Sequence, residues 1–122
     1  MSENKTLMIV DDSKVSRMMI KAIVLDKAPD IKILEAGDGQ EAFELAEGSV
    51  VDYFSVDYNM PNMDGIEFIT KMSKQRTGSK FALLTANIQE ATHKKAEQIG
   101  AKCINKPISE TCITSMLEYF ND

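Results

Sequence analysis

The chain has 122 residues, of which 43% are hydrophobic and 27% charged, and its formal net charge at pH 7 is -5. This composition predicts one soluble globular domain over residues 1–122, and the acidic balance, with no basic run, argues against binding to nucleic acid or to an anionic membrane surface. The first residues lack the charged and apolar regions of a signal peptide and no apolar run has membrane-spanning length, so we expect a cytoplasmic protein.

Strand-like apolar runs alternate with segments of helical period along the chain. Residues 6–10 form the first predicted strand, and Ser13 is the predicted N-cap of the helix that follows. The apolar residues of that helix recur at i, i+3, i+4, i+7 and i+8, which predicts that they form its buried face: Val15, Met18, Met19, Ala22 and Ile23. Residues 31–36 read as a second strand and residues 37–39 as a turn. Residues 40–47 read as a short helix that buries Ala42, Phe43, Leu45 and Ala46.

The second half of the chain repeats this alternation. Strands are predicted over residues 51–56, 81–84 and 102–105, with helices over 65–75 and from about 88 to 99, the latter ending at Gly100. A last helical stripe consists of Ile113, Met116, Leu117 and Phe120. Five strand–helix pairs with short connections predict an open α/β fold, with a parallel sheet covered by helices on both faces.

Polar side chains follow four of the predicted strands at the point where each strand ends. They are Asp11 and Asp12, Asp57, Thr85 and Lys106. In one parallel sheet these carboxyl ends share a rim, so the side chains should lie close together. Carboxylates bind a hard cation such as Mg²⁺, while a hydroxyl and an ammonium group bind phosphoryl oxygens. The pattern therefore indicates a site that moves a phosphoryl group onto an aspartate.

These residues, in this order, resemble the receiver domain of bacterial two-component response regulators. The resemblance covers essentially the whole chain and rests on Asp11-Asp12, Asp57 with Met60-Pro61 and Met63-Asp64-Gly65, Thr85-Ala86, and Lys106-Pro107. It implies a flavodoxin-like (βα)5 fold with strand order 2-1-3-4-5, and a stand-alone, CheY-like domain.

The resemblance also implies a role for each rim residue. Asp57 would be the phosphoryl acceptor, and a Mg²⁺ ion would be held by the side chains of Asp12 and Asp57 and the main-chain carbonyl of Asn59, with Asp11 acting mainly through water. Thr85 and Lys106 would bind the phosphoryl oxygens. The peptide bond between Lys106 and Pro107 is a candidate cis bond.

The partners implied are a histidine kinase or phosphotransfer protein, a phosphatase, and a downstream protein target of a chemotaxis or phosphorelay pathway. The expected output surface consists of the helix from Ile88, the fifth strand and the helix from Ser109. We expect a monomer that acts as a switch, assisting its own phosphorylation and dephosphorylation, and not as an enzyme.

Three positions depart from or refine the family pattern. Cys103 stands where receivers often carry Tyr or Phe, whose rotamer reports phosphorylation. Output here is expected to rely on backbone and helix shifts, and the alternative is a contribution from another group such as Tyr58 or Phe54. Asn59 and Asn87 match positions that influence how fast the phosphoryl group is lost. Cys103 and Cys112, without a C-x-x-C pair, are expected to be buried free thiols.

A different function class uses the same kinds of residue. Haloacid-dehalogenase-like phosphatases also combine an aspartate nucleophile with a hydroxyl, a lysine and Mg²⁺, but their nucleophile belongs to a D-x-D motif on the first strand. Here the candidate nucleophile follows the third strand, and its second neighbour is Asn59. The switch is therefore the favoured reading. His93, in a polar helical stretch, is expected to be a solvated surface side chain.

Overall fold

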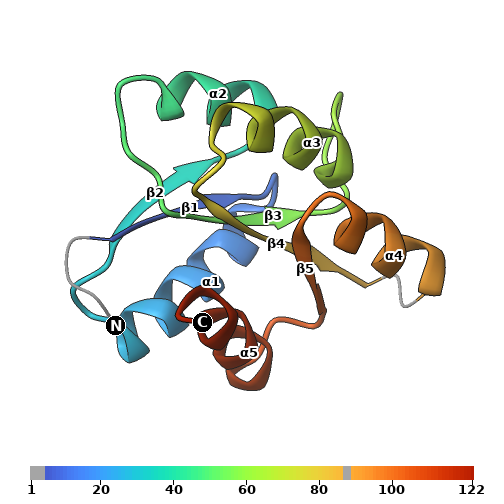
Figure 1. Cartoon of the computed structure of the whole chain (residues 1–122). Helices are drawn as coiled ribbons and strands as arrows, with labels where there is room; N and C mark the ends of the chain where they lie inside the picture. Colours follow the sequence, from blue (N-terminus) through green and yellow to red (C-terminus); the bar gives the residue numbers. More distant parts are fainter. Residues whose placement is uncertain (1–4, 87–88) are drawn as a thin grey trace.

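A computed structural model describes residues 5–86 and 89–122. Five parallel strands form one sheet in the order β2-β1-β3-β4-β5 (Figure 1), which confirms the predicted flavodoxin-like fold. The strands are β1 (Thr6–Val10), β2 (Lys32–Ala36), β3 (Tyr53–Asp57), β4 (Lys80–Thr85) and β5 (Ala101–Asn105). The helices are α1 (Lys14–Lys27), α2 (Gly39–Ala46), α3 (Gly65–Gln75), α4 (Glu90–Gln98) and α5 (Glu110–Phe120).

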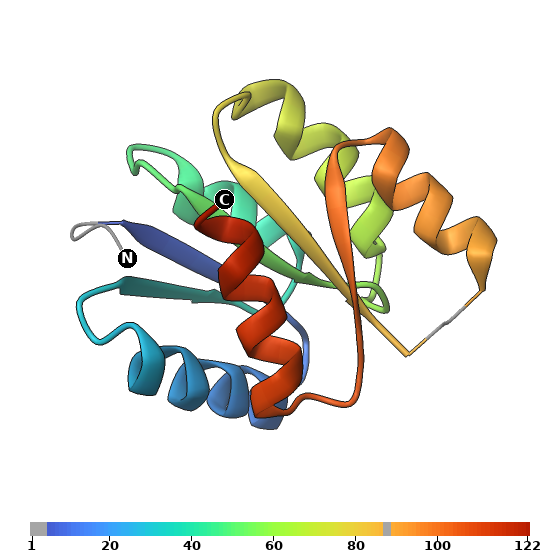
Figure 2. The same cartoon turned by 60° about the horizontal axis from the view of Figure 1, so that its bottom comes forward.

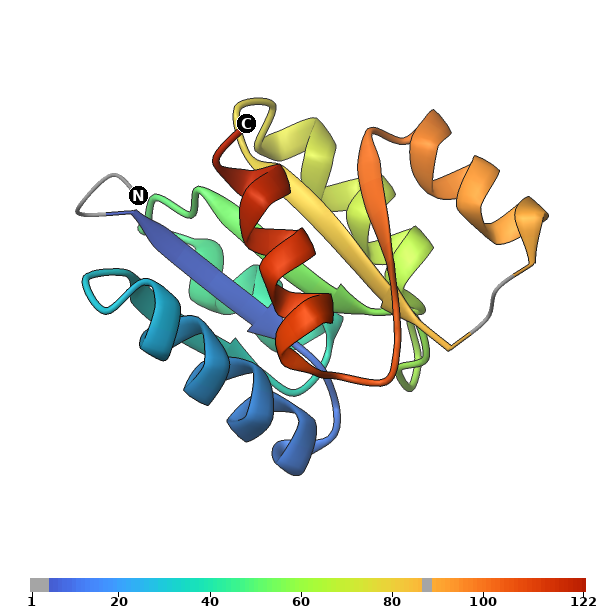
Figure 3. The ribbon, with the colours of Figure 1, turned by 90° about the horizontal axis from the view of Figure 1, so that it is seen from below.

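The helices cover both faces of the sheet. α1 and α5 lie side by side on one face (Figure 3), and α2, α3 and α4 lie on the other. α4 packs against β5, at the opposite edge of the sheet from α1 (Figure 2). Every residue of β1 and β3 is buried, because these central strands have a helical layer above and below them.

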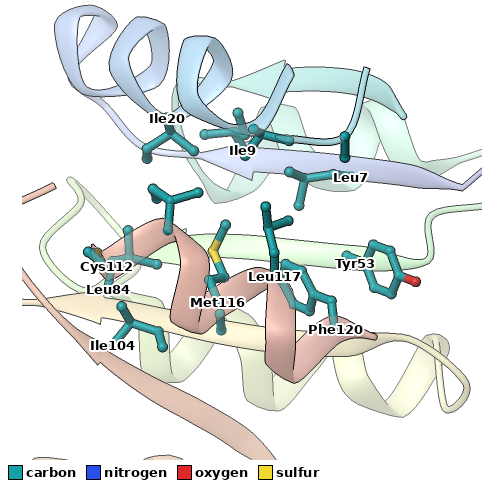
Figure 4. Close-up of a cluster of buried hydrophobic side chains, with 14 of the residues drawn as sticks. Leu7, Ile9, Ile20, Tyr53, Leu84, Ile104, Cys112, Met116, Leu117 and Phe120 are labelled. Atoms are coloured by element: carbon teal, nitrogen blue, oxygen red, sulfur yellow. The ribbon is translucent and has the colours of Figure 1, made fainter. Parts of the chain in front are cut away.

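Each helical layer has its own apolar core. On the α1–α5 face, Ile20 belongs to one apolar cluster with Ile9, Leu84, Ile104 and Met116, whose side chains lie between the sheet and the helices (Figure 4). On the other face the core is built from aromatic and aliphatic side chains of β3, β4 and α3, with Phe54 stacked on Phe81 at a ring distance of 4.8 Å. Both cores pack against the central strands β1, β3 and β4, and this packing holds the strand ends in place.

Helix starts and stops follow local chemistry. Four helices begin at a side chain that accepts a hydrogen bond from the N–H three residues further on: Ser13, Asp38, Asp64 and Ser109. Gly100, with φ at +79°, follows α4 as the predicted glycine stop. The predicted strand 6–10 and helix 65–75 match β1 and α3, and the other predicted boundaries differ from the observed ones by at most two residues. Asn87 and Ile88 lie outside the described residues.

The predicted buried face of α1 is wrong at four of its five residues, and only Ile23 is partly buried and packs against the core. Val15, Met18 and Met19 are 66%, 59% and 44% exposed, whereas Ile20 and Val24 are buried. The helix carries apolar residues on two sides, and hydrophobic spacing alone cannot choose between them. In the structure the side that carries Ile20 and Val24 packs into the core, and Arg17 hydrogen-bonds to the ends of β1 and β2.

Other sequence-based expectations are corrected in detail. Leu45 of α2 is 37% exposed instead of buried. His93 is only partly exposed, and its Nε2 atom is buried without a hydrogen-bond partner among the described residues. Cys103 and Cys112 are both free, but only Cys112 is buried. Among the described helices, none is long and apolar enough to cross a bilayer.

Candidate phosphoryl-acceptor site

The carboxyl ends of four strands meet at one rim of the sheet. Asp11 directly follows β1, Asp57 and Thr85 are the last residues of β3 and β4, and Lys106 directly follows β5. The strand register places these ends level with one another, since Asp57 pairs with Leu84 and Thr85 pairs with Asn105. The structure therefore brings together the strand-end residues that the sequence singled out.

Three carboxylates converge at this rim. One carboxylate oxygen each from Asp11, Asp12 and Asp57 lies within 4.8 Å of the others. Asp11 and Asp57 are buried, at 2% and 6% exposure, while Asp12 is exposed. Such an all-oxygen set, closed on the inner side and open on the outer side, suits a hard cation that keeps some of its waters. The residues present thus fit a Mg²⁺ ion.

Lys106 supplies the positive charge of the site. Its Nζ atom lies 2.7 Å from Oδ1 of Asp57, and its side chain is 24% exposed. Its main-chain N–H donates to the carbonyl oxygen of Thr85 at 2.9 Å, which ties the lysine to the end of β4. The Lys106–Pro107 peptide bond is cis, as the family resemblance implied. The ammonium group therefore stands directly beside the candidate nucleophile.

The two buried carboxyls are held in an environment that favours their protonated forms. Burial raises the pKa of Asp57 above its ordinary value of 3.8, and the hydrogen bond and charge of Lys106 lower it only in part. Burial likewise raises the pKa of Asp11, against a hydrogen bond from the Ser13 N–H, and the negative charge of Asp57 raises it further. A cation bound among these oxygens would relieve the repulsion between them.

Gly65 sets the distance between α3 and the nucleophile. Its N–H donates to the carbonyl oxygen of Tyr58 at 2.9 Å. A Cβ atom at this position would lie 2.6 Å from the carbonyl oxygen of Asp57 and 2.6 Å from Cδ1 of Leu83. Only glycine lets the helix begin flush against the end of β3, and this contact fixes the main chain that carries Asp57.

Two further predicted positions are placed less directly. Thr85 is buried, at 1% exposure, at the end of β4. Asn59 lies exposed in the loop between β3 and α3. The role of its main-chain carbonyl as a metal ligand stays a prediction, and so does the role of Asn87.

Sequence reasoning missed Arg17. Its Nη1 atom donates to the main-chain carbonyl of Asp11 at 2.5 Å, and its Nε atom donates to Oε1 of Glu35 at 3.1 Å. A single arginine within an otherwise apolar helical face was the only signal in the sequence. It pointed to no partner, because the atoms it meets belong to the ends of β1 and β2.

Comparison with known proteins agrees with this geometry. The family model described as the response regulator receiver domain matches residues 7–118. The nitrate/nitrite response regulator protein NarL of Escherichia coli K12 is 30% identical over 100 residues, covering 81% of this chain and 46% of that protein. The transcriptional regulatory protein PdtaR of Mycobacterium tuberculosis is 31% identical over 115 residues, covering 93% of this chain and 55% of that protein. The chain thus spans about half the length of these curated relatives.

A solved structure shows the same arrangement. The chemotaxis protein CheY4 of Vibrio cholerae superposes with a TM-score of 0.83 at 26% identity, covering 95% of this chain and 98% of that one. The match supports the fold, with five parallel strands in the order 2-1-3-4-5. The chain therefore belongs to the response regulator receiver domain family and is a signalling switch domain of the CheY-like fold.

Proposed function

We propose that this receiver accepts a phosphoryl group on Asp57, in a Mg²⁺-dependent reaction, from a histidine kinase or phosphotransfer protein. The observation that carries the proposal is the position of the buried Asp57 carboxylate. It lies within the acidic cluster and 2.7 Å from the Lys106 ammonium. Membership of the receiver family supports the same reaction class.

The reaction is a displacement at phosphorus. One carboxylate oxygen of Asp57 attacks the phosphorus of a phosphohistidine, and the P–N bond breaks. The imidazole leaves with the bonding electron pair and takes up a proton, and an aspartyl phosphate remains. Because a carboxylate is a weak nucleophile, the rate depends on positioning and on neutralising the charge of the transferring group.

The chain's own residues divide this work. Gly65 and the end of β3 hold the Asp57 carboxylate at the rim, and Lys106 places an ammonium group where a phosphoryl oxygen would arrive. Thr85, at the neighbouring strand end, is the proposed hydroxyl donor to a second phosphoryl oxygen. When bound between Asp11, Asp12 and Asp57, Mg²⁺ supplies the remaining positive charge.

We propose that the phosphodonor protein covers the rim and the first turns of α1. The N-cap of α1, Ser13, directly follows Asp12, so a protein that reaches Asp57 must also meet this end of the helix. Val15, Met18 and Met19 expose apolar side chains there. Apolar groups beside a reactive rim suit a protein donor, because burying them stabilises the encounter.

The decisive experiment uses a small-molecule donor. Incubation with acetyl phosphate and Mg²⁺ should add one phosphoryl group by intact mass, and Asp57→Asn should abolish the addition. Asp64→Asn is the matched control, since Asp64 caps α3 through its Oδ1 atom and asparagine caps a helix equally well. Undiminished labelling of Asp57→Asn would refute the assignment.

The phosphatase alternative is tested by adding p-nitrophenyl phosphate to the same protein with Mg²⁺. Steady hydrolysis of p-nitrophenyl phosphate would indicate a hydrolytic enzyme, whereas a receiver should not sustain turnover of a generic phosphate monoester. The position of the nucleophile candidate at the end of the third strand, and not the first, favours the receiver.

A further inference from the structure

Arg17 links the ends of two strands at the edge of the acidic cluster. It lies in the second turn of α1, and its side chain is only 17% exposed. Its guanidinium group donates through Nη1 to the carbonyl oxygen of Asp11 and through Nε to Glu35 of β2. Lys21 binds the other carboxylate oxygen of Glu35 at 3.4 Å, so Glu35 is held from two sides.

This contact completes a three-point hold on Asp11. The N–H of Asp11 donates to the carbonyl oxygen of Ala36 at 3.0 Å, and its Oδ1 atom accepts from the N–H of Ser13 at 2.9 Å. Arg17 holds the remaining polar group, the carbonyl oxygen. That carbonyl belongs to the peptide unit joining Asp11 to Asp12, so holding it restricts the main chain that carries both carboxylates.

The charge of Arg17 is directed elsewhere. The guanidinium of Arg17 forms its ion pair with Glu35, 3.1 Å away. Its contact with the acidic cluster is the hydrogen bond to the carbonyl oxygen of Asp11, which belongs to the main chain of the loop between β1 and α1.

We propose that Arg17 is a positioning residue for the cation site, which it serves by fixing the peptide between Asp11 and Asp12. The inference rests on the proposed function, because it concerns the Mg²⁺ site of that reaction. Without Arg17 the loop retains its carboxylates but loses the geometry in which they converge with Asp57. Groups that orient metal ligands in this way typically contribute 10- to 100-fold in metal affinity.

The test is a Mg²⁺ titration of the full chain, followed by amide chemical shifts in the absence of any phosphodonor. Arg17→Met should raise the Kd for Mg²⁺ by about 10-fold or more. Arg17→Lys should also bind Mg²⁺ weakly. An ammonium group lacks the planar fork with which the guanidinium binds the Asp11 carbonyl and Glu35 together. Arg76→Met is the matched control, since Arg76 donates to the carbonyl oxygen of Ser49 at 2.7 Å and lies at the C-terminus of α3. It should leave the Kd unchanged.

Each result decides between distinct explanations. A folded Arg17→Met with wild-type Kd would overturn the inference, and full rescue by Arg17→Lys would show that only charge matters and overturn it as well. If Arg17→Met does not fold, Glu35→Ala is the deciding variant. It removes the hydrogen-bond acceptor of the Arg17 Nε atom and should raise the Kd for Mg²⁺ by a smaller factor. An unchanged Kd would then overturn the inference. Failure of the wild-type protein to bind Mg²⁺ would instead refute the proposed function.

Discussion

Asp11 is a buried carboxylate whose surroundings suit its protonated form. Burial and the charge of Asp57 raise its pKa above 3.8, which is the value expected in the unfolded chain. Between that value and the raised pKa, the folded state binds more protons than the unfolded state. Stability contributed by this group is therefore present at low pH, falls as the pH rises through that window, and stays lost at neutral pH.

The substitution Asp11→Asn should consequently stabilise the metal-free protein. Asparagine keeps the oxygen that accepts from the Ser13 N–H, but it carries no charge to bury. Thermal unfolding at several pH values should show a gain that is present at pH 7 and shrinks as the pH approaches 4. The same variant should lose most of the stabilisation that Mg²⁺ gives the wild type.

A control separates this effect from the general effect of removing one negative charge from the protein. Asp38 caps α2 from a half-buried position, with its Oδ1 atom 2.8 Å from the main-chain N atom of Glu41. Asp38→Asn removes the same charge and should leave both the stability and the Mg²⁺ response close to those of the wild type. A destabilised Asp11→Asn at pH 7 would contradict the pKa argument.

Gly65 gives a second prediction at the residue level. Gly65→Ala places a methyl group 2.6 Å from two atoms, so the start of α3 must move away from β3. We expect a loss of about 1–3 kcal/mol in the free energy of unfolding, measured by urea titration, and slower labelling by acetyl phosphate. Gly78→Ala is the control, because a Cβ atom there meets nothing within 4 Å. Equal stability of the two variants would rule out the close packing.

At the level of elements, α1 shows the limit of reading periodicity alone. Both of its sides carry apolar residues at helical spacing, and the side predicted to be buried is the one that faces solvent. By contrast, α3 has a single apolar stripe, Phe68, Ile69 and Met72, and all of it is buried. In α1 the side that packs into the core carries Ile20 and Val24, and on that side Arg17 hydrogen-bonds to Asp11 and Glu35 at the ends of β1 and β2.

Substitutions on the two sides of α1 should differ sharply in cost. Ile20→Ala empties space in the core of the α1–α5 face and should reduce the free energy of unfolding by about 2–5 kcal/mol. Met18→Gln, on the exposed side, should change it by less than about 0.5 kcal/mol. Urea unfolding of the two variants measures both. A large loss in the free energy of unfolding for Met18→Gln would indicate that the face predicted from periodicity is the buried one.

The elements β4, α4 and β5 carry the expected response to phosphorylation. Thr85 ends β4 and Lys106 follows β5, so a phosphoryl group that binds both would draw these two strand ends toward Asp57. Cys103 of β5 is too small for an aromatic rotamer switch, so we expect the main chain and α4 to carry the signal. A shift of a few kcal/mol between two states is enough to change their populations substantially.

Amide chemical shifts with a beryllofluoride phosphoryl mimic test this response. We expect changes from Thr85 through α4 and around Lys106, and Thr85→Ala should shrink the distal changes while Asp57 remains phosphorylatable. Changes confined to the rim would indicate a phosphate carrier and not a conformational switch.

At the level of the whole molecule, the sheet and the candidate site residues could be predicted from the same pattern in the sequence. Each of β1, β3 and β4 is a run of buried residues followed or ended by a polar group, so strand ends and candidate site residues were found together. Arg17, Gly65 and the rotation of α1 could not be predicted in this way. Their roles depend on atoms contributed by segments that become neighbours only in the folded sheet.

The central position of β3 in the sheet also affects how fast its backbone amides exchange their hydrogens with solvent. β3 lies between β1 and β4 and is buried on both faces, whereas β5 is an edge strand with exposed residues at Lys102 and Asn105. Hydrogen exchange of β3 should therefore require global unfolding, while amides of α4 and β5 should exchange through smaller, more frequent openings. Exchange measured by mass spectrometry should show the slowest deuterium uptake around Asp57 and faster uptake at the β5 edge. The phosphoryl group would then sit on the part of the molecule that opens least often, with its signal read on the part that opens most readily.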